Sequence, residues 1–354
     1  MAWPLIKLLP KKTNIGFVQF ARPAAIVSVL LVIASFASFF TGGFRDNPAA
    51  VYAAAEGGPI EKAGAVLANG FALGIDFKGG AVVEIEAPHD IDLEAVRNAV
   101  DALGIGDVQV QSYSPTVDDG KSHATVSFQT GDGSDDEGAE SDEALTDRVS
   151  AEIRNVVPDV TIAREDVVGA KVSGELFTSG LLALGLAIGL MLIYIWFRFE
   201  SRFGAGAVVA LFHDVILTLG LFSLFRIEFT LTIIAALLTI IGYSMNDTVV
   251  VFDRLRENYR KFKRTPRPEV IDLSINETLS RTIMTSVTSL LAAVALWVFG
   301  GKALEGFAIA MTFGIFIGTY SSVYVASPAT LLWAPEPGGD PAGGERLEAE
   351  QGAT

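Results

Sequence analysis

The feature that most constrains the fold is a set of six apolar runs, each long enough to cross a lipid bilayer. They cover residues 24–41, 176–197, 204–225, 229–252, 280–299 and 304–333. A spanning helix needs roughly 20 mostly apolar residues. In total 50% of the 354 residues are hydrophobic, which is too much for an ordinary soluble domain. We therefore predict a polytopic α-helical membrane protein with six transmembrane helices, the last of which tilts or breaks near Pro328.

Basic residues are unevenly distributed between the connecting segments. Residues 1–23 and the loop 253–277 are rich in lysine and arginine, whereas the short connections around Arg226 and Lys302 are not. The positive-inside rule therefore places both termini in the cytoplasm, including the acidic tail 334–354. The leader before the first apolar run is long for a secretory signal, so we expect this helix to remain as an anchor.

Residues 42–175 form one sizeable domain outside the cytoplasm. Alternating apolar residues predict strands, and helical spacing predicts helices, in the order 81–87, 92–103, 107–113, 123–129, 142–157 and 160–168. This βαββαβ order favours an α+β ferredoxin-like fold for the core, residues 71–168. Residues 44–70 resemble an insertion that forms a loop or short helix. The acidic run "GDGSDDEGAES" (131–141) is most simply a solvated loop, and calcium binding is the alternative.

The composition excludes several kinds of active site. There is no cysteine, so disulfides, thiolate nucleophiles and cysteine-based metal sites are absent. The three histidines, His89, His123 and His213, lie far apart and match no metal-binding spacing. Since the sequence also lacks an evident nucleophile–base pair or cofactor loop, we expect no enzyme activity, metal, cofactor or nucleic-acid partner.

Two carboxylates interrupt the apolar runs. Asp214 lies near the middle of the third run beside His213, and Asp247 lies two turns inside the fourth beside Asn246. Ionisable groups inside spanning helices are costly, so we interpret both as functional. A carboxylate in low dielectric can exchange a proton between two aqueous faces, with Arg281 as the partner of its ionised form. The alternatives are that Asn246 only joins helices and that Arg281 only anchors its helix end.

The fifth run has a polar face that should point into the bundle. Thr285 and Ser289 follow Arg281 at helical spacing, and an adjacent row consists of Thr278, Thr282 and Ser286. Small residues form further stripes, which indicate tight helix packing or pairing with a second bundle. These stripes are Gly185 with Gly189, and Gly306, Ala310, Gly314 and Gly318.

Four motifs follow one another along the chain. They are "GIDFKGG" (74–80), "HDVILTLG" (213–220), "GYSMNDTVVVFDRLREN" (242–258) and "NETLSRTIMTSVTSLLA" (276–292). In these motifs and their order, the chain resembles the SecF family of bacterial protein-export membrane proteins. One departure is Lys78, which stands where the family more often has threonine.

The resemblance implies a subunit that pairs with SecD in a unit similar to exporters of the resistance-nodulation-division type. Such a unit associates with the SecYEG channel and YajC, and uses the proton-motive force to complete preprotein translocation after SecA has acted. It would lie in the bacterial inner membrane with a periplasmic domain. The alternatives are a half-size proton-driven exporter of small molecules or lipids, and a non-catalytic scaffold subunit.

The resemblance also implies roles for individual residues. It places Asp247, Arg281 and Asp214 on the proton path. We expect Asn246, His213, Thr285 and Ser289 to be supporting polar residues. The remaining motif residues are expected to be structural, and the first glycines to shape the junction between the first helix and the exported domain. They are Gly74, Asp76, Gly79, Gly80 and Gly242.

Overall fold

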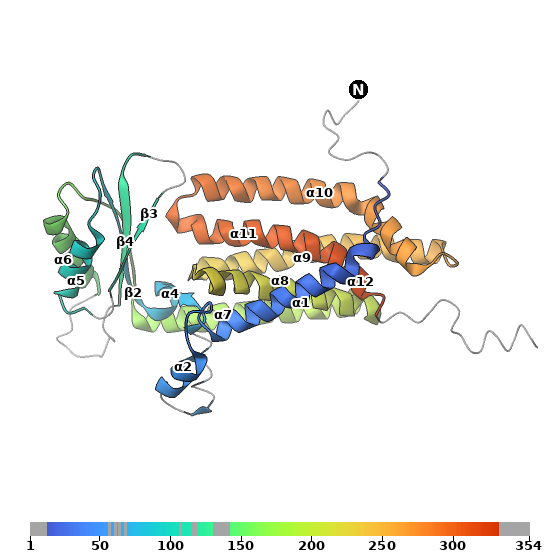
Figure 1. The fold of residues 1–354 in the computed structure, drawn as a ribbon, viewed down its shortest axis with the longest axis horizontal. Coiled ribbons are helices and arrows are strands. Elements are labelled where there is room, and N and C mark those ends of the chain that lie inside the picture. The colour runs from blue at the N-terminus through green and yellow to red at the C-terminus, as the bar shows by residue number, and fades with distance from the viewer. Residues whose placement is uncertain are drawn as a thin grey trace, which may run out of the picture.

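The chain folds into an elongated helical bundle with an α+β domain at one end, as the computed structural model shows (Figure 1). The structure describes residues 13–332, except 56–57, 60–61, 63–64, 67–68, 106–107, 115–118 and 130–141. Our expectations for the acidic run 131–141 and the tail 334–354 lie outside these residues.

Within the described residues, six helices are long and apolar enough to cross a membrane, which confirms the number predicted from the sequence. A short helix, η1 (Val18–Phe20), leads into the first of them. The six are α1 (Ala21–Phe40), α7 (Ala170–Arg198), α8 (Ser201–Phe225), α9 (Leu231–Lys261), α10 (Arg267–Phe299) and α11 (Lys302–Ser321).

The helical path becomes irregular after α11, close to Pro328 as predicted. A π-helical segment, η2 (Ser322–Ala326), and a single turn, α12 (Ser327–Ala329), continue the helix. Proline has no N–H group, and its ring crowds the carbonyl one turn earlier. The Ser327 hydroxyl instead donates to the Ser322 carbonyl at 2.8 Å. The widened turn thus accommodates the proline without ending the helix.

The predicted loop 253–277 is wrong in its extent. Helix α9 continues to Lys261 and α10 begins at Arg267, so only residues 262–266 connect them. The two helices extend as a pair because Arg254 Nε and Asn258 Nδ2 each donate to Glu277 at 2.7 Å. The predicted loop was too long because the apolar residues end where the bilayer is expected to end, whereas both helices continue beyond that point.

Helix α9 contacts four other long helices of the bundle. It packs against α7, α8, α10 and α11, and buries Ile233, Leu237 and Ile240 completely. Helices α7 and α10 lie at the periphery, and this chain leaves most of their apolar surface uncovered. That surface is available to lipid or to a second subunit.

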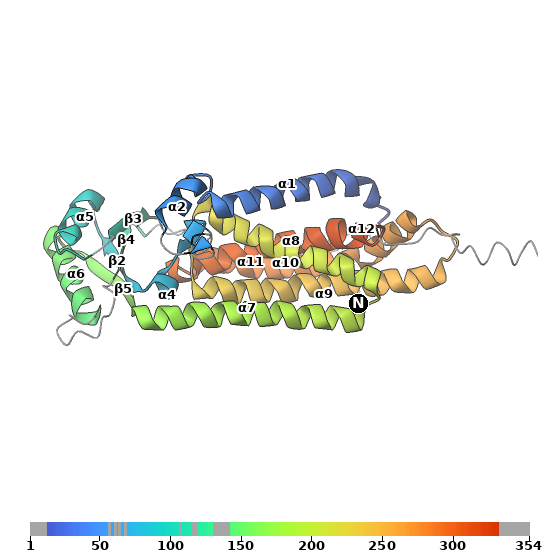
Figure 2. The same ribbon diagram turned by 90° about the horizontal axis from the view of Figure 1, so that it is seen from below.

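The α+β domain contains a four-stranded antiparallel sheet, with strand order β3-β4-β2-β5. Two helices cover one face through Val96, Val100, Val149 and Ile153, and the other face is turned toward the bundle (Figures 1 and 2). In chain order the elements are β2 (Gly80–Ala87), α5 (Leu93–Asp101), β3 (Val108–Tyr113), β4 (Ser122–Phe128), α6 (Asp142–Val156) and β5 (Thr161–Val168).

A short helix, α2 (Pro48–Ala54), occupies part of the segment 44–70. Asn47 caps it, because its Oδ1 accepts a hydrogen bond from the N–H of Ala49 at 3.0 Å. Proline at the first helical position also favours helix initiation here. The described part of this segment therefore includes the short helix that its composition suggested.

Candidate functional site

Asp247 lies on the face of α9 that packs against α10. The residue is 6% exposed, and its Oδ1 accepts a hydrogen bond from Thr282 Oγ1 at 2.9 Å. Its Oδ2 is buried and has no hydrogen-bond partner among the described residues. Buried polar atoms are normally hydrogen-bonded, because uncompensated desolvation is costly. The free oxygen is therefore a position where a proton can bind.

Arg281 does not form the contact with Asp247 that the sequence suggested. The residue is exposed, and within the described ranges it forms no ion pair with Asp247, although it lies close enough to interact electrostatically. Successive side chains on an α-helix project about 100° apart. Because Thr282 points at α9, the neighbouring Arg281 is turned away from the contact between the two helices.

The polar row that faces α9 and α11 is the one that contains Thr282 and Ser286. Ser286 Oγ accepts from Tyr243 OH at 3.0 Å and lies 2.7 Å from Thr319 Oγ1. Thr285 instead donates to the carbonyl of Arg281 in its own helix, at 2.9 Å. No hydrogen bond in the described part of the chain joins Thr285 or Ser289 to Asp247.

Asp214 on α8 is the more deeply buried carboxylate, with 1% exposure. Its Oδ2 accepts hydrogen bonds from Ser244 Oγ of α9 and from Ser321 Oγ of α11, the latter at 2.7 Å. His213 Nδ1 lies 2.9 Å from Oδ1. Both oxygens are therefore satisfied, in contrast to those of Asp247. The two serines could not be assigned from the sequence, which does not say which helices are neighbours.

A line of polar groups leads from Asp214 to α1. His213 Nε2 lies 3.2 Å from Ser28 Oγ, and Ser28 Oγ lies 3.0 Å from Tyr320 OH. Tyr320 OH donates to the carbonyl of Ala24 at 3.0 Å. The imidazole of His213 and the hydroxyls of Ser28 and Tyr320 can each donate and accept, so a proton could move between these neighbours, whereas the Ala24 carbonyl only accepts.

The two carboxylates are connected through one turn of α9. Ser244 bonds Asp214, and Asp247 follows three residues later on the same side of the helix. His213 thus contacts the carboxylate of its sequence neighbour Asp214, and Ser244 links Asp214 to the turn of α9 that carries Asp247. The arrangement combines buried acids with hydroxyl donors, which suits proton binding and exchange.

Asn246 and Gly242 lie on the opposite side of α9. Both are exposed, and a Cβ atom built at Gly242 would contact nothing within 4 Å. No hydrogen bond of Asn246 is found within the described part of the chain. An amide at this depth that faces away from its own bundle suits contact with another protein more than contact with lipid.

The "GIDFKGG" motif attaches the α+β domain to the connection between α8 and α9. Strand β1 (Ala72–Leu73) pairs in parallel with β6 (Glu228–Phe229). In the short helix α4 (Ile75–Lys78), Asp76 Oδ2 accepts a hydrogen bond from the N–H of Leu231 at 2.8 Å. This carboxylate caps the first turn of α9. The expected junction with the first helix is therefore, in the described structure, a junction with α9.

Two glycines of the motif have backbone conformations that other residues rarely adopt. Gly79 has φ of 74° and Gly80 has φ of 126°. A Cβ atom on Gly80 would also overlap the carbonyl oxygen of Phe128 on β4. Glycine is therefore required for the chain to pass from α4 into β2.

The sheet contacts the bundle again at the start of α11. Lys302 Nζ lies 5.5 Å from the centroid of the Tyr113 ring, and this lysine forms an ion pair with Glu305 at 2.6 Å. Burial, followed by the charge of Glu84, raises the pKa of Tyr113 to about 12. Tyr113 therefore stays a neutral phenol that packs beneath the ammonium group.

These features define a class: a multi-pass membrane protein whose bundle contains ionisable groups and whose α+β domain is attached to a central helix. The sequence matches the family described as "Protein export membrane protein SecD/SecF, C-terminal" over residues 148–336, and the "SecD/SecF GG Motif" over residues 64–87. The second match contains the motif that caps α9.

Relatives and solved structures agree with this class. "Protein translocase subunit SecF" of Cereibacter sphaeroides is 41% identical over 94% of both chains, and that of Rickettsia bellii is 37% identical over 93% of this chain and 96% of its own. A crystal structure of SecDF, a translocon-associated membrane protein from Thermus thermophilus, matches with a TM-score of 0.72 and 32% identity. The match covers 93% of this chain and 40% of that longer chain. The chain belongs to the SecF family of protein translocase subunits.

Proposed function

We propose that this chain uses the proton-motive force to assist the late stage of preprotein translocation, as one half of a unit formed with SecD. The observation that carries the proposal is the carboxylate of Asp247, which is buried in α9 with one oxygen unbonded. Ser244, which lies one turn before Asp247 in α9, donates a hydrogen bond to Asp214 of α8. An ionisable group kept at such a cost inside a membrane bundle is expected to change its charge during function.

The energy available is sufficient for this role. One proton that crosses a potential of 100 mV releases about 2.3 kcal/mol. A difference of about 1.4 kcal/mol changes an equilibrium tenfold, so a single proton could strongly bias two poses of the α+β domain. A domain that holds an emerging chain in one pose and releases it in the other would oppose backsliding.

The proposal also includes the fold type and membrane side of the α+β domain and the partners of the chain. We assign the α+β domain to the ferredoxin-like type and to the periplasmic side, because its strand order is that of a split βαβ repeat and the opposite end is basic. SecD would cover the side of α9 that carries Asn246 and the neighbouring surface of α10 that carries the exposed Arg281. We also propose SecYEG and YajC as partners and a functional link to SecA, as the resemblance to the SecF family implies.

The test compares wild type with Asp247→Asn in vesicles that contain this chain, SecD and the SecYEG channel. Release of a preprotein after SecA has acted is measured with and without a proton gradient. We expect the wild type to respond to the gradient and Asp247→Asn to lose the response. Asp253→Asn is the matched control, because Asp253 lies on the same helix but forms a half-exposed ion pair with Arg198 at 2.6 Å.

Assembly with SecD is measured for each variant by copurification. If Asp247→Asn assembles and still responds fully to the gradient, the carboxylate is structural and the proposed role of Asp247 in proton coupling is wrong. In that case Asp214 or the SecD half carries the proton.

A further inference from the structure

A second cluster of ionisable groups lies on the α+β domain, away from the membrane carboxylates. Glu86 of β2 and His123 of β4 are direct neighbours across two antiparallel strands. Asp119 precedes His123 by four residues. One potential ligand atom from each of the three residues lies within 4.8 Å of the other two.

Only one of the two ring nitrogens of His123 has a hydrogen-bond partner among the described residues. His123 is 6% exposed, and its Nε2 lies 2.9 Å from Asp119 Oδ1. An ionised carboxylate only accepts hydrogen bonds, so Nε2 carries the proton in the neutral ring and Nδ1 carries the lone pair. Nδ1 is buried and has no hydrogen-bond partner among the described residues.

The unpartnered Nδ1 faces a second acceptor. It lies 3.9 Å from Glu86 Oε1, which is too long for a hydrogen bond between them. Zinc binds imidazole nitrogen and carboxylate oxygen at about 2.0–2.2 Å. Two such ligands on one ion lie between about 3.3 Å apart at a tetrahedral angle and about 4.2 Å apart when opposed. The observed distance of 3.9 Å between Nδ1 and Oε1 falls between these two values.

We propose that Glu86 and His123 bind a divalent transition-metal ion of the Zn²⁺ type, with Asp119 holding the imidazole in the required tautomer. Metal-binding histidines usually donate their other ring N–H to a carboxylate, which is the role that Asp119 has here. Water would complete the coordination. The neutral phenol of Tyr113, whose ring centroid lies 5.2 Å from that of His123, supplies packing and no ligand.

Lys121 competes with the metal for this site. Its Nζ lies 2.7 Å from Glu86 Oε2, and its side chain is 46% exposed, so it can swing into water. An ammonium group next to the site disfavours a cation by direct repulsion. Removing this charge should therefore strengthen metal binding, which is an effect that no damaged fold would produce.

Sequence spacing predicted no metal site, because Glu86 and His123 are far apart along the chain and meet only through strand pairing. The site lies on the sheet face turned toward the bundle, next to the contact of Tyr113 with Lys302. A bound ion would join β2 to β4 beside that contact. This inference does not depend on the proposed proton coupling.

The experiment titrates Zn²⁺ into the full-length chain in detergent, in competition with a fluorescent zinc chelator at neutral pH. We expect saturable binding of one ion by wild type. His123→Gln and Glu86→Gln should each weaken binding at least tenfold. Asp119→Asn should weaken it about tenfold, because the imidazole loses the carboxylate that holds its tautomer. His89→Gln, which changes the exposed histidine outside the cluster, is the matched control and should bind as wild type does.

The decisive variant is Lys121→Gln, which should bind Zn²⁺ several times more tightly than wild type. The proposal is overturned if wild type shows no saturable binding, if His123→Gln binds equally well, or if Lys121→Gln binds no more tightly. Circular dichroism and gel filtration of each variant confirm that weaker binding does not come from unfolding.

Discussion

A single hydroxyl orients the carboxylate on which the proposed function depends. Thr282 Oγ1 donates to Asp247 Oδ1, and this is the one hydrogen bond to that carboxylate in the described part of the chain. The donor comes from α10, whereas Asp247 belongs to α9. The bond therefore fixes the carboxylate relative to a neighbouring helix, and the other oxygen stays open to a proton.

Thr282→Val removes this donor while it keeps the shape of the side chain. Loss of this donor disfavours the ionised carboxylate by about 1–3 kcal/mol, so we expect gradient-dependent preprotein release to fall about fivefold or more. The measurement is the rate of release from vesicles with and without the gradient. Thr282→Ser retains the hydroxyl and should keep most of the response. An unchanged response in Thr282→Val would show that the bond is dispensable.

The sequence identifies the two buried acids but not the side chains that bond them. Asp214 and Asp247 stand out because a carboxylate in an apolar run has few structural explanations. Their serine and threonine partners come from other helices, and nothing in a single sequence states which helices touch. For the same reason, the row of Thr285 and Ser289 was favoured over the row that faces α9.

The packing of α9 against α11 depends on two glycines of the stripe in α11. A Cβ atom on Gly314 would overlap the side chain of Ile240, and one on Gly318 would lie 3.0 Å from Ser244 Cβ. Ser244 is the residue that bonds Asp214. Close approach of these helices therefore brings the hydroxyls of α9 and α11 within reach of Asp214.

Gly314→Ala should destabilise the bundle by about 1–3 kcal/mol, because the added methyl group overpacks a fully buried contact. The matched control is Gly185→Ala on α7, where a Cβ atom would meet nothing within 4 Å. That change should be neutral or stabilise by up to about 1 kcal/mol through helix propensity. Unfolding in mixed detergent micelles measures both. Equal stabilities of the two variants would contradict the packing described here.

Whole elements were predicted well where apolar periodicity extends over many residues. The positions of the six spanning helices and of the strands follow from it directly. Their ends were less certain, as α9 and α10 show, because polar helices outside the bilayer have no apolar signal. The contact between the "GIDFKGG" motif and the start of α9 was also missed, since a main-chain cap between distant segments leaves no periodic pattern.

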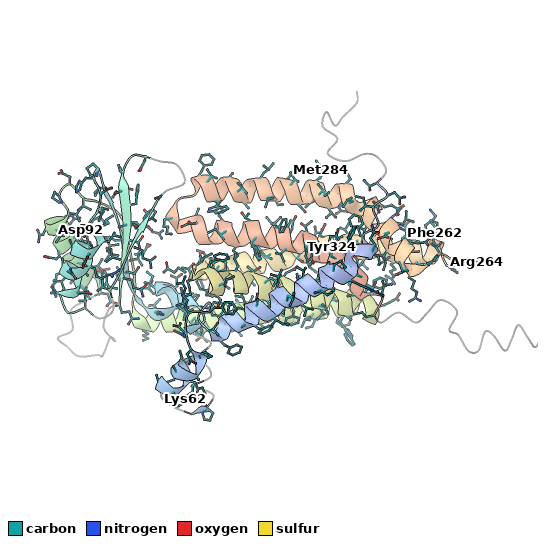
Figure 3. All side chains as sticks on the ribbon, in the orientation of Figure 1. Lys62, Asp92, Phe262, Arg264, Met284 and Tyr324 are labelled. Atoms are coloured by element: carbon teal, nitrogen blue, oxygen red, sulfur yellow. The ribbon has the colours of Figure 1, made fainter. Side chains whose placement is uncertain are left out.

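The molecule as a whole has two chemically different ends. The α+β domain is acidic and carries Asp92, whereas the far ends of α9 and α10 are basic and carry Arg264 in their connection (Figure 3). Such an asymmetry gives a multi-pass protein a defined orientation. The proposed topology, with the domain outside the cytoplasm, can therefore be tested at these two positions.

Introduced cysteines report this orientation without background, because the chain contains no cysteine of its own. In spheroplasts, a membrane-impermeant maleimide should label Asp92→Cys almost completely. Arg264→Cys should be labelled only after the membrane is opened. Labelling of Arg264→Cys in intact spheroplasts, with Asp92→Cys protected, would reverse the proposed topology.

Helix α9 is also a mechanical component. It runs without a break from Leu231, whose N–H group is held by Asp76, to Asp247 and beyond. Sixteen residues of α-helix span about 24 Å at 1.5 Å per residue, and an unbroken helix is stiff along its axis. A small axial displacement of α9 at the carboxylate would thus move the start of the helix, and the attached domain, by nearly the same distance. The cap formed by Asp76 is one of the contacts that would carry this movement to the domain, together with the pairing of β1 with β6.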